Sequence, residues 1–337
     1  MGIDTGKLVK EFRAREHSRR AERAALGAAR RYGAVERTAR AGLKVGNALG
    51  PAAMRAATGT LRKAVSDEAL PAWLEEMPEP APAALPRTGR ADAHAIYFPA
   101  CINRIFGPPR GDGELRSVPE AIVAVSAKAG RPVWIPDDVR GHCCGMPWHS
   151  KGFQQGAEHK TNEVVEALWR WSDEGRLPIV TDATSCAGGL LDDVKPFLTE
   201  VNTERHAKLR VLDSIAWLHD EVLPHLDLDR KLGSATVHPP CAARHLNLVG
   251  KLQAVAARLA EDVHVPLDST CCGFAGDRGF LHPELTEAAT REEAAEVHEG
   301  RFDAHLCSNR TCEIGMQRAT GAPYASVAQL LDRLTRP

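Results

Sequence analysis

Eight of the nine cysteines in this 337-residue chain fall into two copies of one layout, about 130 residues apart. Each copy has one cysteine, then a Cys-Cys-Gly triplet followed by a Gly-Phe pair, then a last cysteine. The first copy comprises Cys101, Cys143, Cys144 and Cys186, and the second comprises Cys241, Cys271, Cys272 and Cys312. Random placement does not keep such a register. The sequence therefore predicts two related halves that use their cysteines in the same way.

Short apolar segments alternate with longer helical ones in both halves. The predicted strands are 95–99, 132–136, 178–183, 235–239, 262–266 and 302–306, and the predicted helices are 117–130, 153–173, 245–260 and 283–299. Strands separated by helices of this length favour parallel sheets with crossover helices. The matching cysteines all follow strand ends, where open α/β sheets carry their functional loops. We expect the four thiols of each half to converge.

The predicted organisation is an α/β chain of two tandem βαβαβ-type domains preceded by a helical arm. The arm covers 1–63, a Pro/Ala-rich linker 64–94, the first domain 95–212 and the second 213–337, with a connecting helix over 213–234. The arm carries 15 Lys and Arg against five Asp and Glu, although the whole chain has a net charge of only −1. A basic arm on an acidic body predicts docking to an acidic partner, with peripheral contact to an anionic membrane as the lesser alternative.

Composition predicts a cytoplasmic globular protein, possibly held at the inner face of a membrane only by surface contact. The apolar share is 43% and the charged share 26%. No stretch approaches the roughly 18 apolar residues of a membrane helix, and the first residues lack a secretory signal. Cytosolic thiols stay reduced, so the cysteines indicate metal or redox chemistry rather than disulfides.

Three kinds of chemistry compete for each cysteine set. Zinc clamps usually space two ligands by two to four residues, which adjacent cysteines fit poorly. An iron–sulfur cluster spreads several irons over a few ångström, so neighbouring thiolates can reach different irons. Gly145 and Gly273, directly after the cysteine pairs, would supply tight turns. The pattern favours iron–sulfur clusters over zinc and over metal-free or redox-active thiols.

The doubled layout resembles the cysteine-rich "CCG" domain. That domain occurs twice in the cysteine-rich subunit of heterodisulfide reductase, and also in iron–sulfur subunits of glycolate, lactate and anaerobic glycerol-3-phosphate dehydrogenases. The strings CCGFAGDRGF and SNRTCEIGM most resemble the C-terminal region of long FAD-linked D-2-hydroxyacid (D-lactate type) dehydrogenases. The resemblance covers 95–337. The opening GIDTGKLVKEFR is similar to the segment after the ferredoxin-type module of those enzymes.

The resemblance implies one [4Fe–4S]-type cluster in each half, held by the four cysteines of that half. It also implies that FAD and a ferredoxin-type module lie on a partner chain or in a missing N-terminal region. Heterodisulfide reductase halves end in Cys-x-x-Cys, whereas here Cys186 and Cys312 have no cysteine three residues later. This departure favours electron transfer over disulfide cleavage. Cys307, the ninth cysteine, is expected to be a buried bystander, with a fifth-ligand role as the alternative.

The sequence contains no phosphate-binding loop, nucleophile elbow or zinc-protease motif, so no complete catalytic site is predicted. The favoured function is an electron-transfer module between a flavin that oxidises a D-2-hydroxy acid and a quinone or other acceptor. The alternatives are a heterodisulfide or thiol reductase subunit and a zinc-stabilised scaffold whose arm would bind nucleic acid, a partner not otherwise expected.

Several other polar residues near the cysteines are expected to have plain structural roles. His142 and His149 are expected to be loop histidines, and His238 a satisfied interior histidine. Arg278 and Arg310 are expected to form ion pairs that hold the cysteine loop. The Glu292-Glu293 pair is expected to lie on a solvated helix face.

Overall fold

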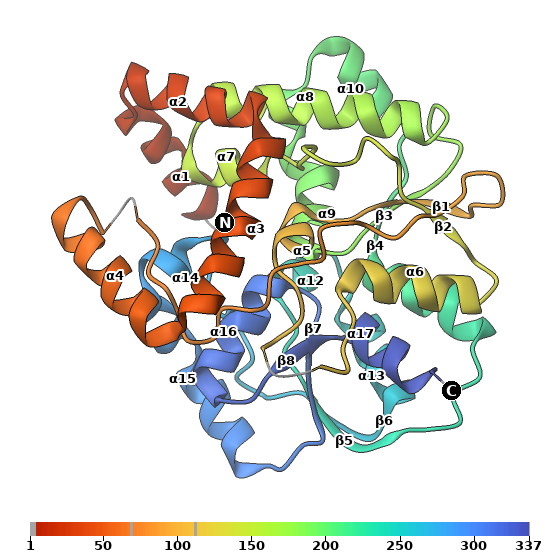
Figure 1. The fold of residues 1–337 in the computed structure, drawn as a ribbon. Helices are drawn as coiled ribbons and strands as arrows, with labels where there is room; N and C mark the ends of the chain where they lie inside the picture. Colours follow the sequence, from red (N-terminus) through yellow and green to blue (C-terminus); the bar gives the residue numbers. More distant parts are fainter. Residues whose placement is uncertain (1–4, 68–69, 111–112, 337) are drawn as a thin grey trace.

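The computed structural model describes residues 5–67, 70–110 and 113–336 (Figure 1). The first four residues of the predicted arm, two of the linker, two of the 107–113 loop and the last residue of the chain lie outside the described residues. Two four-stranded sheets form the centres of the two halves, and all strand pairs within them are parallel. The predicted α/β class with two parallel-sheet domains and a helical N-terminal region is therefore confirmed.

The two sheets have the same strand order, as a duplicated domain should. The first runs β2 (Val133–Trp134), β1 (Ala95–Phe98), β3 (Ile179–Thr181) and β4 (Val211–Asp213). The second runs β6 (Ala260–His264), β5 (Leu232–Val237), β7 (Ala304–Cys307) and β8 (Tyr324–Ser326). Strand β1 is buried along its whole length, as expected for a strand covered by helices on both faces.

The four long crossover helices lie where the apolar periodicity predicts them: α6 (Val118–Lys128), α8 (Gln154–Trp171), α13 (Val249–Leu259) and α15 (Pro283–Glu299). Helix α6 begins with a capping box in which the Ser117 hydroxyl and the Glu120 carboxylate satisfy each other's backbone amides. The C-terminal helix α17 (Val327–Leu334) packs against both α6 and α13, so it joins the two halves.

The last strand of each sheet has no counterpart among the predicted elements. β4 and β8 are three residues long, too short for an alternating pattern to stand out. The connecting helix expected over 213–234 is shorter and irregular: α11 (Ser214–Trp217) continues through a π-helical turn (Leu218–Val222) and a 3-10 turn (Leu223–His225). Pro224 lies in that last turn, and Leu232 already begins β5.

The basic N-terminal region is four helices packed on the body, not a free arm (Figure 1). They are α1 (Thr5–Glu16), α2 (Arg19–Arg30), α3 (Tyr32–Leu49) and α4 (Pro51–Ala64). The Trp148 indole donates to the Ala25 carbonyl at 2.9 Å, and Arg13 donates to the Ser150 carbonyl at 2.8 Å. These bonds anchor the arm on the segment that follows the first cysteine pair.

The predicted linker also packs against the body. After α4, the described residues up to Ala93 form neither a named helix nor a named strand. Trp73, Leu74 and Met77 are nevertheless buried, in one cluster with Phe274 and Phe280 of the second half. The Ala72 amide donates to the Phe280 carbonyl at 2.7 Å. The segment thus covers the second cysteine loop. Among the described residues, no helix is long and apolar enough to span a membrane.

Candidate metal centres

The first cysteine set converges at the carboxyl end of the first sheet. Cys101 begins α5 (Cys101–Ile105) after β1, Cys143 and Cys144 lie in the loop between β2 and α7 (Met146–Lys151), and Cys186 lies in α9 (Thr184–Gly188) after β3. The Sγ atoms of Cys101 and Cys143 are 3.6 Å apart, and those of Cys144 and Cys186 are 3.3 Å apart. All four are buried and none forms a disulfide.

Crowding and burial favour the protonated form of these thiols when no metal is bound. The contact with Cys143 and burial raise the pKa of Cys101. The contact with Cys101 lowers the pKa of Cys143, but Cys144 and burial raise it to about 12 overall. A metal replaces such thiol protons and compensates the thiolate charge. Four converging, unpaired sulfurs in a buried pocket fit a metal or iron–sulfur centre.

The second cysteine set occupies the matching edge of the second sheet. Cys241 begins α12 (Cys241–His245), Cys271 and Cys272 lie in the loop before α14 (Arg278–Leu281), and Cys312 lies in α16 (Arg310–Thr320). The Sγ atoms of Cys272 and Cys312 are 3.1 Å apart and buried, whereas Cys241 and Cys271 are exposed. The Cys241–Cys271 contact raises the pKa of Cys241 and lowers that of Cys271. This set also fits a metal, with one side open to solvent.

Cys307 is the last residue of β7 and is fully buried. Burial raises the pKa of its thiol, and contact with Cys312 opposes that rise. Its Sγ lies 4.0 Å from the Asn309 carbonyl oxygen. Its position beside Cys312 is compatible with both the bystander role and the ligand role.

The glycine after each cysteine pair adopts the backbone conformation that the sequence predicted for a tight turn. Gly145 has φ +85° and Gly273 has φ +69°, both in the left-handed region. A Cβ on Gly145 would lie 2.8 Å from Cγ2 of Thr161, and one on Gly273 would lie 2.7 Å from the Leu285 carbonyl oxygen. Both turns therefore need glycine for conformation and for space.

An arginine three residues after the first cysteine of each set holds the cysteine-pair loop, and the sequence reasoning missed it. Arg104 is buried; it forms a two-point ion pair with Glu36 of α3, at 3.1 and 3.0 Å, and donates to the carbonyls of Val139 and His142 at 3.0 and 2.6 Å. Arg244 donates to the Ser269 hydroxyl at 2.8 Å and also to the Ser269 carbonyl. The repeated Cys-x-x-Arg spacing was the signal that could have found both.

The other predicted loop residues have structural surroundings. The His142 ring packs edge-on against Trp171, and the His149 ring against Phe197, each at 5.0 Å between ring centroids. Arg310 is buried and forms an ion pair with Glu313 at 2.5 Å, within α16. Arg278 begins α14 and is half-buried. The ring contacts of both histidines and the ion pair of Arg310 agree with the structural roles expected for these residues.

His238 and Glu293 differ from their predicted roles. Glu293 is not on a solvated face: it is 2% exposed and accepts from His238 Nδ1 at 2.8 and 2.9 Å. Its neighbour Glu292 is exposed, because successive helix positions point in different directions. His238 is interior as predicted but is not satisfied, since its Nε2 is buried without a hydrogen-bond partner in the described structure.

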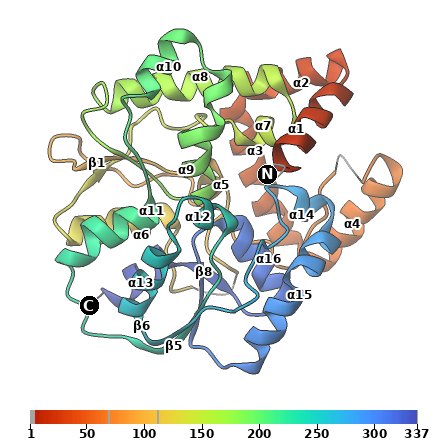
Figure 2. The same ribbon diagram turned by 180° about the vertical axis from the view of Figure 1, so that it is seen from behind.

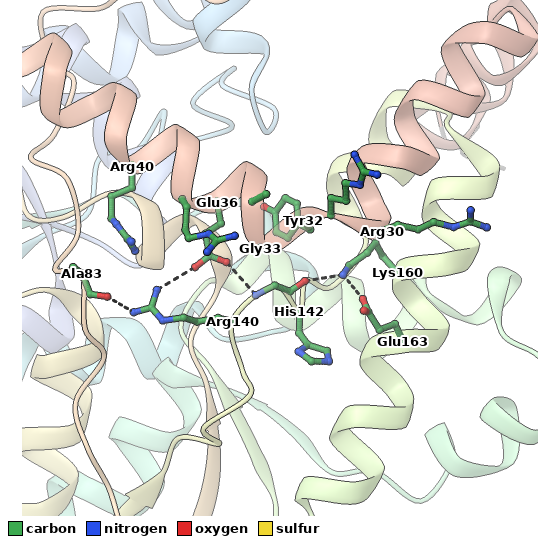
Figure 3. A pocket seen from close by; sticks show the side chains of 14 residues that line it. Arg30, Tyr32, Gly33, Glu36, Arg40, Ala83, Arg140, His142, Lys160 and Glu163 are labelled. Carbon is green, nitrogen blue, oxygen red and sulfur yellow. Dashed lines mark hydrogen bonds and ion pairs between the residues drawn. The ribbon is translucent and has the colours of Figure 1, made fainter.

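A basic cavity of about 620 Å³ lies beside the first cysteine set (Figure 3). Its charged lining comprises Arg30, Arg31, Arg37, Arg40, Arg140 and Lys160 against Glu36 and Glu163. Arg140 donates to the Ala83 carbonyl at 2.6 Å, and Lys160 donates to the Gly141 carbonyl at 2.7 Å, next to the cysteine-pair loop. Tyr32 also lines the cavity, and its pKa is raised by burial and then by the nearby Cys101 and Cys143. The cavity therefore connects the basic helices with the first cysteine set.

The convergence of both sets agrees with a comparison against known families. The family described as "Cysteine-rich domain" (CCG) matches residues 95–190 and 235–317, which together hold all nine cysteines. The chain belongs to the CCG family. Each match begins at the first strand of a half and contains one complete Cys, Cys-Cys-Gly, Cys set.

Curated relatives of this CCG chain include subunits of several dehydrogenase systems. It is 24% identical over 193 residues to the glycolate oxidase iron-sulfur subunit of Escherichia coli, covering 55% of this chain and 46% of that subunit. It is 25% identical over 179 residues to lactate utilization protein A of Oceanobacillus iheyensis, covering 50% and 70% of the two chains. For a subunit of the anaerobic glycerol-3-phosphate dehydrogenase of Escherichia coli, the values are 22% over 198 residues, 56% and 49%. The match thus spans about half the length of two of these relatives.

Proposed function

We propose that this chain is the iron–sulfur electron-transfer module of a flavin-linked D-2-hydroxyacid dehydrogenase of the D-lactate or glycolate type. The observation that carries the proposal is the convergence of two equivalent, disulfide-free cysteine sets in a chain of the CCG family. The similarity to a glycolate oxidase iron-sulfur subunit supports the iron–sulfur assignment. FAD would lie on a partner chain or module.

In this proposal, Cys101, Cys143, Cys144 and Cys186 hold one cluster of the [4Fe–4S] type, and Cys241, Cys271, Cys272 and Cys312 hold the other. When bound, the clusters would supply one-electron transfer between the flavin and a quinone or another acceptor. The chain's own residues exclude water from the first site, because its four sulfurs are buried in a core that includes residues of the N-terminal helices. Arg104 and the turn glycines fix the position of the cysteine loops.

We further propose that the basic cavity is the docking point of the flavoprotein, through an acidic surface on that partner. Arg30, Arg31 and Arg37 are exposed at its rim. Nη1 of Arg40 is buried without a hydrogen-bond partner in the described part of the chain, so an incoming carboxylate would satisfy it. Charge complementarity of this kind accelerates association. An anionic membrane at the cytoplasmic side is the other occupant that the test should separate.

The proposal is tested by mixing the anaerobic, cluster-loaded chain with an FAD-containing D-lactate dehydrogenase and D-lactate, and following its visible absorbance by stopped flow. We expect bleaching that slows as salt is raised. The double variant Arg30→Glu/Arg37→Glu should slow it about tenfold or more at low salt. The matched control is Arg291→Glu, at an exposed arginine on α15 in the other half.

Equal slowing by Arg291→Glu, or no bleaching with any D-2-hydroxy acid, would contradict the proposed donor. Cosedimentation with vesicles rich in phosphatidylserine measures the membrane alternative. If Arg30→Glu/Arg37→Glu abolishes vesicle binding but leaves the bleaching rate unchanged, the cavity faces a membrane and the docking proposal is wrong.

A further inference from the structure

The second cysteine set includes a histidine that the doubled cysteine layout does not supply. A ring nitrogen of His238 and the Sγ atoms of Cys272 and Cys312 all lie within 4.8 Å of one another. All three residues are buried. His238 follows β5 directly and lies three residues before Cys241, so the same strand end presents both side chains to the site.

The two ring nitrogens of His238 have different environments. Nδ1 is held by both carboxylate oxygens of Glu293, at 2.8 and 2.9 Å. Nε2 is buried and has no hydrogen-bond partner in the described structure. A buried imidazole nitrogen without a partner costs about 1–3 kcal/mol. Because Nδ1 is already engaged, Nε2 is the nitrogen available to a metal.

Glu293 also determines which nitrogen carries the proton. An ionised carboxylate only accepts hydrogen bonds, so Nδ1 must be the donor, and a neutral imidazole then has its lone pair on Nε2. A carboxylate behind the distal nitrogen is the usual support of a metal-binding histidine, since it fixes the tautomer and the ring orientation. Glu293 is on α15, a separate element from β5, so the pairing needs the folded domain.

The matching position of the first half carries no donor side chain. Phe98 stands where the second half has His238, in the matching strings YFPAC and VHPPC. Its ring packs against Trp171, with 6.2 Å between the ring centroids. The two cysteine sets are therefore chemically different, although their cysteines are in register.

We infer that His238 binds the second metal centre through Nε2, with Glu293 as the positioning residue that holds its ring. The inference rests on the proposed function, because it assumes that the second cysteine set binds iron. A neutral imidazole adds less negative charge than a thiolate, and histidine ligation raises the potential of iron–sulfur centres. The second centre should then have the higher reduction potential of the two, so that electrons collect there.

The test uses the anaerobic full-length chain labelled with ¹⁵N-histidine and partly reduced, so that one centre is paramagnetic. Pulsed electron paramagnetic resonance should detect one strongly coupled ¹⁵N nucleus in the wild type. His238→Phe, which copies the first half, should abolish that coupling and lower the second reduction potential. His305→Phe is the matched control, because His305 is a half-buried histidine on the adjacent strand β7.

Iron and acid-labile sulfide measured on the same samples separate the two claims. Both iron and sulfide present with no strong ¹⁵N coupling would overturn the histidine ligand and leave the proposed function standing. Absence of iron and sulfide would overturn the proposed function itself. The wild-type spectrum decides the point even where His238→Phe does not fold. Glu293→Gln, which keeps an acceptor for Nδ1, should retain the coupling, and Glu293→Ala should weaken it.

Discussion

The Thr184 and Ser308 hydroxyls lie 3.2 Å apart and join the loops that follow β3 and β7. The adjacent pair, Ser185 and Asn309, repeats the contact at 3.3 Å. Helices α9 and α12, which carry or begin with cysteines, also touch across the same boundary (Figure 2). The two halves therefore face each other with their cysteine-bearing edges.

If both sets bind clusters, this arrangement brings two paramagnets close together on reduction. We expect the electron paramagnetic resonance spectrum of the fully reduced chain to be broadened by spin–spin interaction. Cys186→Ser should remove the first centre and leave a simple, unbroadened spectrum of the second. Unbroadened spectra from a chain with both clusters loaded would show that the two centres do not face each other as described.

Arg104 should be essential for the first centre only. Its buried guanidinium joins Glu36 to the backbone of the cysteine loop. Arg104→Ala leaves the Glu36 carboxylate buried without its cation, which costs about 3–5 kcal/mol. We expect the variant to lose about half of its iron and to melt at lower temperature. The exposed counterpart variant Arg244→Ala should lower the melting temperature less.

Gly145→Ala should damage the same site through the backbone. Its φ of +85° and the 2.8 Å approach to Thr161 both disfavour a side chain. We expect a loss of about 1–3 kcal/mol in the free energy of unfolding, and reduced iron content. Gly89→Ala is the control, since nothing lies within 4 Å of its added Cβ and its φ is not positive. Equal effects of the two substitutions would contradict the role assigned to the turn.

Cys307→Ala separates the bystander from the ligand. A fully buried bystander should lose only its packing, so the variant keeps its full iron and sulfide content. Cys312→Ala should lose the second centre. Equal iron loss in both variants would make Cys307 a fifth donor and favour heterodisulfide-type chemistry in the second half.

Asp213 should make the fold less stable as pH rises. Burial raises the pKa of this carboxyl to about 7, although hydrogen bonds from the Ile215 amide and Thr184 oppose the shift. The folded state therefore binds more protons than the unfolded state between about pH 4 and pH 7, and the stability from the protonated form is lost over that window. Its full size is at most about 4 kcal/mol, from 1.36 kcal/mol per pKa unit.

Asp213→Asn removes this titration. Relative to wild type, we expect it to raise the free energy of unfolding at pH 8 and to change it little near pH 4.5, as measured by urea unfolding at both pH values. A variant that is destabilised equally at the two pH values would indicate that the carboxyl acts only as the N-cap of α11.

The repeat of the cysteines and the strand–helix alternation were enough to predict both sheets and the long crossover helices. The three-residue strands β4 and β8 were missed, because so short a segment carries no periodic signal. The packing of Trp73 and Met77 was missed because a Pro/Ala-rich segment also suits a free linker. The His238–Glu293 pair joins residues 55 positions apart, and no local pattern could show that they meet.

The most direct test is to purify the chain without oxygen and measure iron, acid-labile sulfide and zinc per polypeptide, with electron paramagnetic resonance of reduced and oxidised samples. Two four-iron clusters predict about eight irons and eight sulfides, no stoichiometric zinc, and signals that change on reduction. Zinc without sulfide in a colourless protein would contradict the account and leave a structural metal protein.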